Sequence, residues 1–271
     1  MKLKLLKHVA VVSPSGNITA VVFDQLLKIN RKFLNDSIVQ KWKKKHPSQE
    51  IEQCCFVTVP IKSEAIGRVE MFGGEFCGNA TRSVVWLLTK GEDYSGLIEV
   101  SGVSRPLAFE VKNKEVAVEM PLPTTGGTLV EAAAEGILVH LEGISHLVVT
   151  GSDQKQTPRQ LLQSLLDTNK YGLKDLPAVG VSYFNPTTGK AEFCVWGKEV
   201  DAIFDETACG SGTCSIGIAL ASQDKRSIEQ NITQPSGEVI QTRTDYVSDA
   251  VTKSWISGKV TVLHDGELSL V

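Results

Sequence analysis

The feature that most constrains this chain is a short motif that occurs twice. Residues 75–88 read EFCGNATRSVVWLL, and residues 206–220 read ETACGSGTCSIGIAL. Each copy places a Cys-Gly pair and small polar residues directly before an apolar run. That pattern predicts a helix that begins at the cysteine. Each half of the chain is therefore expected to present a cysteine at a helix N-terminus.

Other residues repeat at nearly the same spacing. Cys77 and Cys209 are 132 positions apart (209 − 77), and the residues that follow them also match as Gly with Gly, Thr with Thr and Ser with Ser. The pairs Ser101-Gly102 and Ser236-Gly237 are separated by 135 positions (236 − 101). Because these offsets are close to half of the 271 residues, the sequence predicts two similar halves.

Most other segments predict short strands, because they are rich in Val, Ile, Phe and Thr and are bounded by Gly, Pro, Asn or Asp. These segments are 3–12, 18–23, 54–60, 67–72, 97–102, 107–111, 115–120, 136–141, 146–151, 178–184, 192–196, 231–235, 238–242 and 259–264. Two further helices are predicted within 31–46 and within 157–170, the second with Thr157 as N-cap and Pro158 at its first position. We expect an α/β (α+β) fold of two pseudo-symmetric domains, each a curved, mainly antiparallel sheet around a central helix. The segment MPLPTTGG at 120–127 is the best boundary between them.

Composition excludes several classes of function. The formal charge is −3 and the pI is near 6.0, so we expect no nucleic-acid partner and no membrane partner. The basic run Lys41–His46 is interpreted as a solvated helix end. Charged residues interrupt the apolar N-terminus, and no window holds the roughly 18 apolar residues of a membrane span, which indicates a cytoplasmic protein.

Six cysteines occur, and their spacing fits neither a disulfide framework nor a zinc site. We therefore expect no metal. Cys54, Cys55 and Cys194 are interpreted as small buried hydrophobic residues. Cys77 and Cys209 differ from these because each precedes a helix.

A helix N-terminus favours both a bound anion and a thiolate. Its first N–H groups lack partners within the helix and carry partial positive charge, so they bind carboxylates. The same field lowers the pKa of a cysteine from about 8.5 to between roughly 3.5 and 7.5. Two such thiols across a cleft between the halves could act on one amino acid, one removing the α-proton and the other returning a proton to the opposite face. This scheme inverts the α-carbon and needs no cofactor.

The motifs CGNATRS and ETACGSGTCS, together with SPSGN near the N-terminus, resemble the active-site motifs of the diaminopimelate epimerase family. The resemblance implies two pseudo-symmetric α/β domains, with the last strand returning to the first domain. The expected division is 1–121 with about 262–271, and 122–261. It further implies a homodimer, with Cys77 and Cys209 as the catalytic acid/base pair. By the same resemblance, Asn17 binds the amino acid substrate, and its carboxylate is bound at Gly78, Asn79, Gly210 and Ser211.

One departure bears on the substrate. Diaminopimelate epimerases carry a Glu-Arg pair before the second cysteine, whereas the present stretch, VWGKEVDAIFDETACG, has Val200 and Asp201 there and no arginine. The segments PSGNIT, GGEFCGNAT, CGSGTCSIG and QPSG are more similar to histidine racemases that act without pyridoxal phosphate, as is EQCCF at 52–56. Histidine is therefore the favoured substrate, and Glu52 and Glu75 are candidate binders of its side chain.

Several alternatives remain open at this stage. Asp205 and Glu206, beside the second cysteine, could contact the substrate or only favour the helix dipole. The chain could be a diaminopimelate epimerase, a racemase of another amino acid, or a non-catalytic amino acid binding protein. Phenazine-type isomerases of the same superfamily lack the cysteine pair, which argues against them. The five histidines lie outside the motifs and are assigned no catalytic role.

Overall fold

The computed structural model of the chain describes residues 6–23, 31–71, 73–123, 127–152 and 154–269. Predicted strand residues 3–5 and 72, and residues 124–126 of the predicted boundary segment, lie outside the described residues. The chain forms two compact units. The first comprises the residues up to Val118 together with those from Lys259 onward, and the second comprises Glu119–Gly258.

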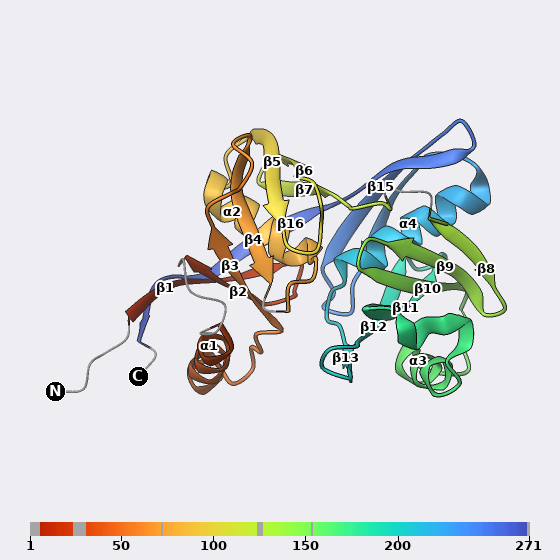
Figure 1. The fold of residues 1–271 in the computed structure, drawn as a ribbon, viewed down its shortest axis with the longest axis horizontal. Coiled ribbons are helices and arrows are strands. Elements are labelled where there is room, and N and C mark those ends of the chain that lie inside the picture. The colour runs from red at the N-terminus through yellow and green to blue at the C-terminus, as the bar shows by residue number, and fades with distance from the viewer. Residues whose placement is uncertain (1–5, 24–30, 72, 124–126, 153, 270–271) are drawn as a thin grey trace. The chain divides into compact units, whose positions relative to one another are not determined.

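The strands of the first unit form a ring through their pairings. Strand β16 (Ala250–Ser269) is long (Figure 1), and its residues from Lys259 onward belong to this unit, where they pair with β1. The order from β1 is sequential to β7, and β7 neighbours β16 as well, so the ring closes. Its other strands are β1 (Leu6–Pro14), β2 (Thr19–Phe23), β3 (Gln53–Thr58), β4 (Ala65–Met71), β5 (Tyr94–Val100), β6 (Leu107–Lys112) and β7 (Glu115–Glu119).

Helix α2 (Gly78–Thr89) is the central helix of the first unit. It packs against β1 to β6, and its first eight residues are all buried. Helix α1 (Arg31–Lys45) instead covers the outside of the sheet, with Leu34, Ile38 and Trp42 in one buried cluster. The spacing of four residues places these side chains on one face of the helix, which explains why only that face is buried.

The second unit has the same plan. Helix α4 (Gly210–Asp224) packs against β8 to β11, β14 and β15, while α3 (Pro158–Asp167) and the 3₁₀ helix η2 (Lys170–Asp175) contact the core through Leu162, Leu165, Leu166 and Leu173. The strand order is β16-β15-β14-β12-β11-β10-β9-β8, with β13 beside β12. These strands are β8 (Val130–Ala133), β9 (Gly136–Leu141), β10 (Ile144–Thr150), β11 (Ala178–Asn185), β12 (Lys190–Gly197), β13 (Ala202–Asp205), β14 (Ile228–Thr233) and β15 (Val239–Val247).

The connections show that the two units repeat one design. Four strand pairs are parallel, namely β2 with β3, β4 with β5, β10 with β11, and β12 with β14, and the other paired strands with a described register are antiparallel. Helices α1, α2, α3 and α4 lie in these four connections in turn, because parallel neighbours need a crossover. The prediction of two pseudo-symmetric, mainly antiparallel sheets, each around a central helix, is confirmed. Strands β8 and β13, of four residues each, were not predicted.

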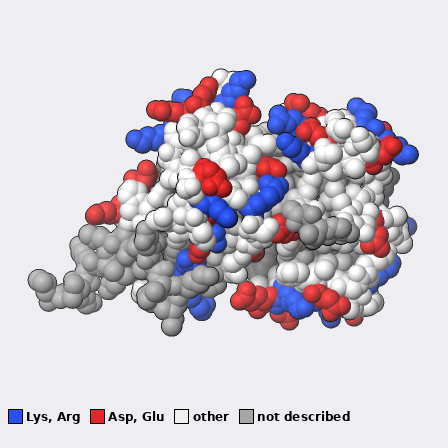
Figure 2. Space-filling view, turned by 45° about the horizontal axis from the view of Figure 1, so that its top comes forward, with Lys and Arg blue, Asp and Glu red and all other residues white. Residues whose placement is uncertain are grey.

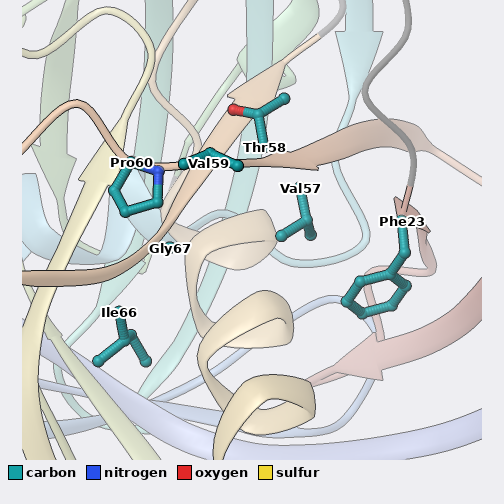
Figure 3. Close-up of a pocket in the computed structure, with 7 residues that line it drawn as sticks. All are labelled: Phe23, Val57, Thr58, Val59, Pro60, Ile66 and Gly67. Carbon is teal, nitrogen blue, oxygen red and sulfur yellow. The ribbon is translucent and has the colours of Figure 1, made fainter.

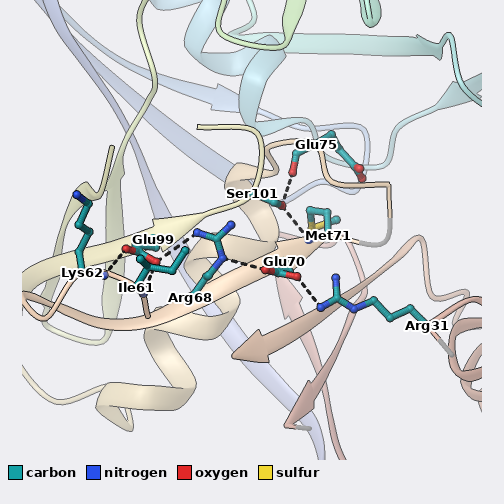
Figure 4. Close-up of polar contacts among 9 residues, drawn as sticks. All are labelled: Arg31, Ile61, Lys62, Arg68, Glu70, Met71, Glu75, Glu99 and Ser101. Atoms are coloured by element: carbon teal, nitrogen blue, oxygen red, sulfur yellow. Dashed lines mark hydrogen bonds and ion pairs between the residues drawn. The ribbon is translucent and has the colours of Figure 1, made fainter. Parts of the chain in front are cut away.

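A chain of ion pairs braces β4 and β5 in the first unit (Figure 4). Arg68 contacts Glu70 at 2.9 Å and Glu99 at 3.2 Å, and Arg31 from α1 contacts Glu70 at 2.5 Å. Glu99 also accepts the backbone N–H groups of Ile61 and Lys62 at 2.9 and 2.7 Å. Burial by itself would raise the pKa of Glu99, but these donors hold it below the usual value. The network ties the segment before β4 to the sheet.

Charged side chains are mixed in sign over the face shown in Figure 2, where lysine and arginine alternate with aspartate and glutamate. Lys43, Lys44 and Lys45 are exposed in the last turn of α1, as expected for a solvated helix end. Among the described residues, no helix is long and apolar enough to cross a membrane.

Candidate active site

Cys77 is the N-cap of α2. Its backbone is extended (φ −138°, ψ 113°), and its Sγ accepts the N–H of Ala80 at 3.4 Å. Thr81 donates its hydroxyl to the Cys77 carbonyl at 2.7 Å, which holds the first turn closed. The cysteine thus occupies the position that serine or aspartate usually fills at a helix start. The residue is partly exposed.

Cys209 repeats this geometry at the start of α4. Its φ and ψ are −122° and 109°, and its Sγ accepts the N–H of Gly212 at 3.3 Å. Its own N–H donates to Oε1 of Gln234 at 3.0 Å, and Gln234 Nε2 donates to Thr213 Oγ1 at 3.0 Å. Gln234 is thereby the link between the QPSG turn and the second cysteine. The sequence prediction that both helices begin at the cysteines is confirmed.

The two serine-glycine pairs of the repeat have matching contacts. Ser101 Oγ donates to the carbonyl of Glu75, two residues before Cys77, at 2.7 Å (Figure 4). The N–H of Ser236 donates to the carbonyl of Thr207, two residues before Cys209, at 2.8 Å. Each turn therefore holds the segment that leads into its cysteine, which explains why these pairs recur at nearly the offset of the motif.

Gly102 is needed next to Ser101. Its φ is +76°, and a Cβ there would lie 2.7 Å from the backbone nitrogen of Phe76. Both the backbone conformation and the close approach to the segment before Cys77 exclude larger residues.

Behind Cys77 lies a line of polar side chains. Its Sγ donates to Gln53 Oε1 at 2.9 Å, Gln53 Nε2 donates to Asn17 Oδ1 at 2.5 Å, and Asn17 Nδ2 donates to Glu52 Oε2 at 2.8 Å. Asn17 is buried and Glu52 is exposed. The sequence indicated Asn17 and Glu52 but gave Gln53 no role. Its only signal was its place in the EQCCF segment.

The side chain of Asn79 is held in place by a buried arginine of the first unit. Its Oδ1 accepts from Arg82 Nη2 at 2.9 Å, and Arg82 Nη1 donates to Ser15 Oγ at 3.2 Å. Arg82 is completely buried, and this burial lowers the pKa of its guanidinium to about 10. In the motif alignment, its counterpart is Cys214, so only the first motif carries a buried cation.

Behind Cys209 the arrangement differs. Ser211 Oγ lies 3.5 Å from Cys209 Sγ and 2.9 Å from His146 Nε2, and His146 Nδ1 lies 3.1 Å from Ser182 Oγ. Burial lowers the pKa of His146 to about 3, so the imidazole is neutral at physiological pH. Sequence reasoning missed His146, since it lies 63 positions before Cys209 (209 − 146), on strand β10.

The acidic residues near the motifs have different surroundings. Asp205 forms an ion pair with Arg159 at 2.8 Å, and Asp201 accepts the indole N–H of Trp196 at 3.0 Å. Glu75 is exposed, and the N–H of Glu206 donates to the carbonyl of Phe193 at 3.1 Å. Asp205 and Asp201 therefore have protein partners of their own.

The remaining cysteines are structural. Cys54, Cys55, Cys194 and Cys214 are buried, and burial raises the pKa of Cys54, Cys194 and Cys214 to about 12. The interpretation of Cys54, Cys55 and Cys194 as buried hydrophobic residues is confirmed. Among the described residues, no group of three His, Cys, Asp or Glu side chains could hold a metal ion.

A hollow of about 530 Å³ lies in the first unit, and its lining residues include none of the cysteine motif (Figure 3). Its lining side chains are apolar apart from one hydroxyl and include no titratable group, so they offer no acid or base for catalysis. The residues that line it are Phe23, Val57, Thr58, Val59, Pro60, Ile66 and Gly67.

Known proteins of similar sequence are histidine racemases. The model of the family described as "Histidine racemase CntK N-terminal domain" matches residues 6–268. A histidine racemase of Fusobacterium nucleatum subsp. nucleatum is 29% identical over 272 residues, which cover 95% of this chain and 95% of that protein.

Solved structures of similar fold are isomerases and their relatives. A phenazine biosynthesis protein of the PhzF family from Bacillus anthracis has a TM-score of 0.67 and 12% identity, with 98% of this chain and 99% of that chain covered. A hydroxyproline epimerase from Agrobacterium vitis, solved with trans-4-hydroxy-L-proline, has a TM-score of 0.62 and 11% identity, with 100% and 94% covered. At these identities the likeness concerns the fold alone.

Proposed function

Because the chain belongs to the family of the histidine racemase CntK N-terminal domain, we propose that it racemises histidine without a cofactor. The chain is an isomerase. The observation that carries the mechanism is the repeated N-cap: two cysteines with nearly the same backbone angles, each with its sulfur 3.3–3.4 Å from the N–H three residues later.

The substrate carboxylate would be bound by the two helix N-termini. The first N–H groups of α2 and α4 have no partners within their helices, and the helix dipoles attract an anion. Gly78 and Gly210, the first residues of these helices, present no side chain that would keep a ligand from the backbone. Asn79 and Ser211 follow them and would add side-chain donors.

Cys77 and Cys209 would act as the acid/base pair. The thiolate of one takes the α-proton and becomes a thiol, while the electron pair of the C–H bond remains on the substrate as an enolate-like carbanion. The N–H groups around the carboxylate stabilise this charge as it develops. The thiol of the other cysteine then donates its proton to the opposite face and becomes a thiolate, so the pair ends with its protonation exchanged.

The acidic surroundings of the cysteines favour an imidazole side chain over a carboxylate. Glu75 is exposed two residues before Cys77, and the exposed Glu52 is joined to Cys77 through Asn17 and Gln53. A second carboxylate on the substrate would meet like charge there, whereas an imidazole N–H would find an acceptor. A site that binds a ring N–H discriminates strongly against amino acids that lack it.

The test is chiral chromatography after incubation of the protein with L-histidine, without added pyridoxal phosphate. We expect D-histidine to form, and in heavy water we expect deuterium at the α-carbon of both enantiomers. Cys77→Ala and Cys209→Ala should each abolish racemisation while the circular dichroism spectrum is unchanged. Faster epimerisation of LL-diaminopimelate than racemisation of histidine would overturn the substrate, and binding without α-proton exchange would overturn the activity.

We also propose that the protein is a cytoplasmic homodimer. Support comes from the resemblance to diaminopimelate epimerases and from cysteines that are all free thiols in the described structure. Light scattering coupled to gel filtration should give about twice the chain mass of 29.4 kDa. A monomeric mass at micromolar concentration would contradict the dimer.

A further inference from the structure

The polar line behind Cys77 has a fixed direction. It runs from the exposed carboxylate of Glu52 through the amides of Asn17 and Gln53 to the sulfur, with contacts of 2.8, 2.5 and 2.9 Å. An ionised carboxylate only accepts hydrogen bonds, whereas an amide has one end that donates and one that accepts. The orientation of each amide therefore follows from the carboxylate at the start of the line.

The direction can be followed atom by atom. Glu52 requires a donor, so Asn17 directs its NH₂ group to it and presents its carbonyl to the next residue. That carbonyl requires a donor in turn, so Gln53 directs its NH₂ group to Asn17 and its own carbonyl to Cys77. The sulfur at the end of the line then faces an acceptor at 2.9 Å. A thiol satisfies that acceptor, while a thiolate would be repelled by it.

The opposite orientation of Gln53 is excluded by its neighbours. Turning the amide over would place two carbonyl oxygens, from Gln53 and Asn17, 2.5 Å apart. Thr19 agrees with the observed orientation, since its hydroxyl accepts from Gln53 Nε2 at 2.8 Å and donates to Asn17 Oδ1 at 3.3 Å.

The described contacts of Cys209 place donors around its sulfur. The N–H of Gly212 points at it from 3.3 Å, and the hydroxyl of Ser211, at 3.5 Å, is free to rotate and donate. On the far side of Ser211, the neutral ring of His146 can take either tautomer and so imposes no direction on the hydroxyl. A thiolate at Cys209 can thus accept from both donors, whereas a thiolate at Cys77 would face the carbonyl of Gln53.

Two features oppose this difference. Cys209 is buried whereas Cys77 is partly exposed, and burial by itself disfavours a thiolate. The buried Arg82 guanidinium favours a thiolate at Cys77, but its N–H groups donate to Asn79 and Ser15. Its effect on the sulfur is therefore Coulombic, without a hydrogen bond. The N–H of Ala80 also points at Cys77, at 3.4 Å, and matches that of Gly212 at Cys209, so it cancels in the comparison.

We infer that the free protein holds its shared proton on Cys77, so that Cys209 is the resting thiolate and Glu52, Asn17 and Gln53 are positioning residues that set this choice. The inference rests on the proposed racemase function and deepens it. The free protein is then poised to take the α-proton with Cys209 from whichever enantiomer presents it there. The other enantiomer must wait for the proton to move from Cys77 to Cys209.

The test is the ultraviolet absorbance of thiolates near 240 nm, measured against pH in Cys77→Ala and Cys209→Ala variants. The other four cysteines should contribute no thiolate absorbance below about pH 9. Burial raises the pKa of Cys54, Cys194 and Cys214 to about 12 and that of Cys55 well above its usual value. We expect Cys209 to ionise at the lower pH, with on the order of tenfold more thiolate than Cys77 at a common pH. Ionisation of Cys77 at an equal or lower pH overturns the inference.

A second pair of variants tests the cause. In the Cys209→Ala protein, Glu52→Gln allows the amides to reverse, so Cys77 should ionise at a lower pH. Glu75→Gln removes the same charge from another exposed carboxylate outside the line, and should shift Cys77 much less. Equal shifts in the pH at which Cys77 ionises would show that the charge of the carboxylate, and not the direction of the amides, decides which cysteine holds the proton. The titrations need no substrate, so their result is independent of the activity assay. Cys77 could ionise first in a protein that racemises histidine, and Cys209 could ionise first in a protein that does not.

Discussion

Gly180→Ala is the substitution for which the structure makes the sharpest prediction. Gly180 on β11 pairs with His146 on β10, and a Cβ at Gly180 would lie 2.2 Å from Nδ1 of the imidazole. Ordinary contacts begin near 3.4 Å. The ring would therefore have to move by about 1 Å, yet it is fully buried and bonded through both nitrogens to Ser182 and Ser211.

The expected cost has two parts. Overpacking of a core typically costs about 1–3 kcal/mol. Displacing the ring also weakens two buried hydrogen bonds, each worth about 1 kcal/mol. We expect the free energy of unfolding to fall by about 2–4 kcal/mol, and the melting temperature to fall by roughly 4–16 °C for a chain of this size. Racemisation should fall too, because Ser211 beside Cys209 loses its support.

Urea denaturation with a matched control measures this effect. Gly197→Ala adds the same methyl group on neighbouring β12, where the Cβ would lie 3.4 Å from Val200, and it should change stability by less than about 0.5 kcal/mol. Adding His146→Ala should cost less in the Gly180→Ala protein than in the wild type, because the clash has gone. If the free energy of unfolding of Gly180→Ala lies within about 0.5 kcal/mol of the wild-type value, the close packing of Gly180 against His146 is refuted.

Three further predictions concern stability. Thr157→Ala breaks the capping box with Gln160 and should cost about 1 kcal/mol by urea denaturation, with racemisation unchanged. Burial alone would raise the pKa of Glu70 and of Glu99, but arginine and N–H donors hold both below the ordinary 4.5. The stability that they contribute is thus present above that value and is lost as the pH falls through the lower folded pKa, and Glu99→Gln should flatten this acid loss of stability. Cys214→Ala removes a buried thiol that donates to a serine hydroxyl at 3.2 Å, and should cost about 1 kcal/mol while turnover stays near that of the wild type.

Helix positions and the repeat could be predicted from local pattern. The starts at Cys77, Thr157 and Cys209 follow from which residues cap helices, and α1 ends at Lys45, before Pro47, because proline restricts the residue that precedes it. The doubled motif predicted two similar halves, since one sequence pattern encodes one supersecondary unit wherever it recurs. Strands β8 and β13 were not predicted, because four residues are too few to show the alternation of apolar and polar side chains that marks a strand.

The environments of the two thiols were decided only by tertiary structure. Glu52 and Gln53 lie 25 and 24 positions before Cys77 (77 − 52 and 77 − 53), and His146 lies on another strand from Cys209. No local propensity links such positions, and sheet pairing brings them together. The Cys-Gly start of the motif repeats, yet a buried arginine and two amides lie behind one cysteine, while a serine and a neutral imidazole lie behind the other. Hydrogen-bond direction, by which the two thiols differ, depends on those distant neighbours and not on the motif itself.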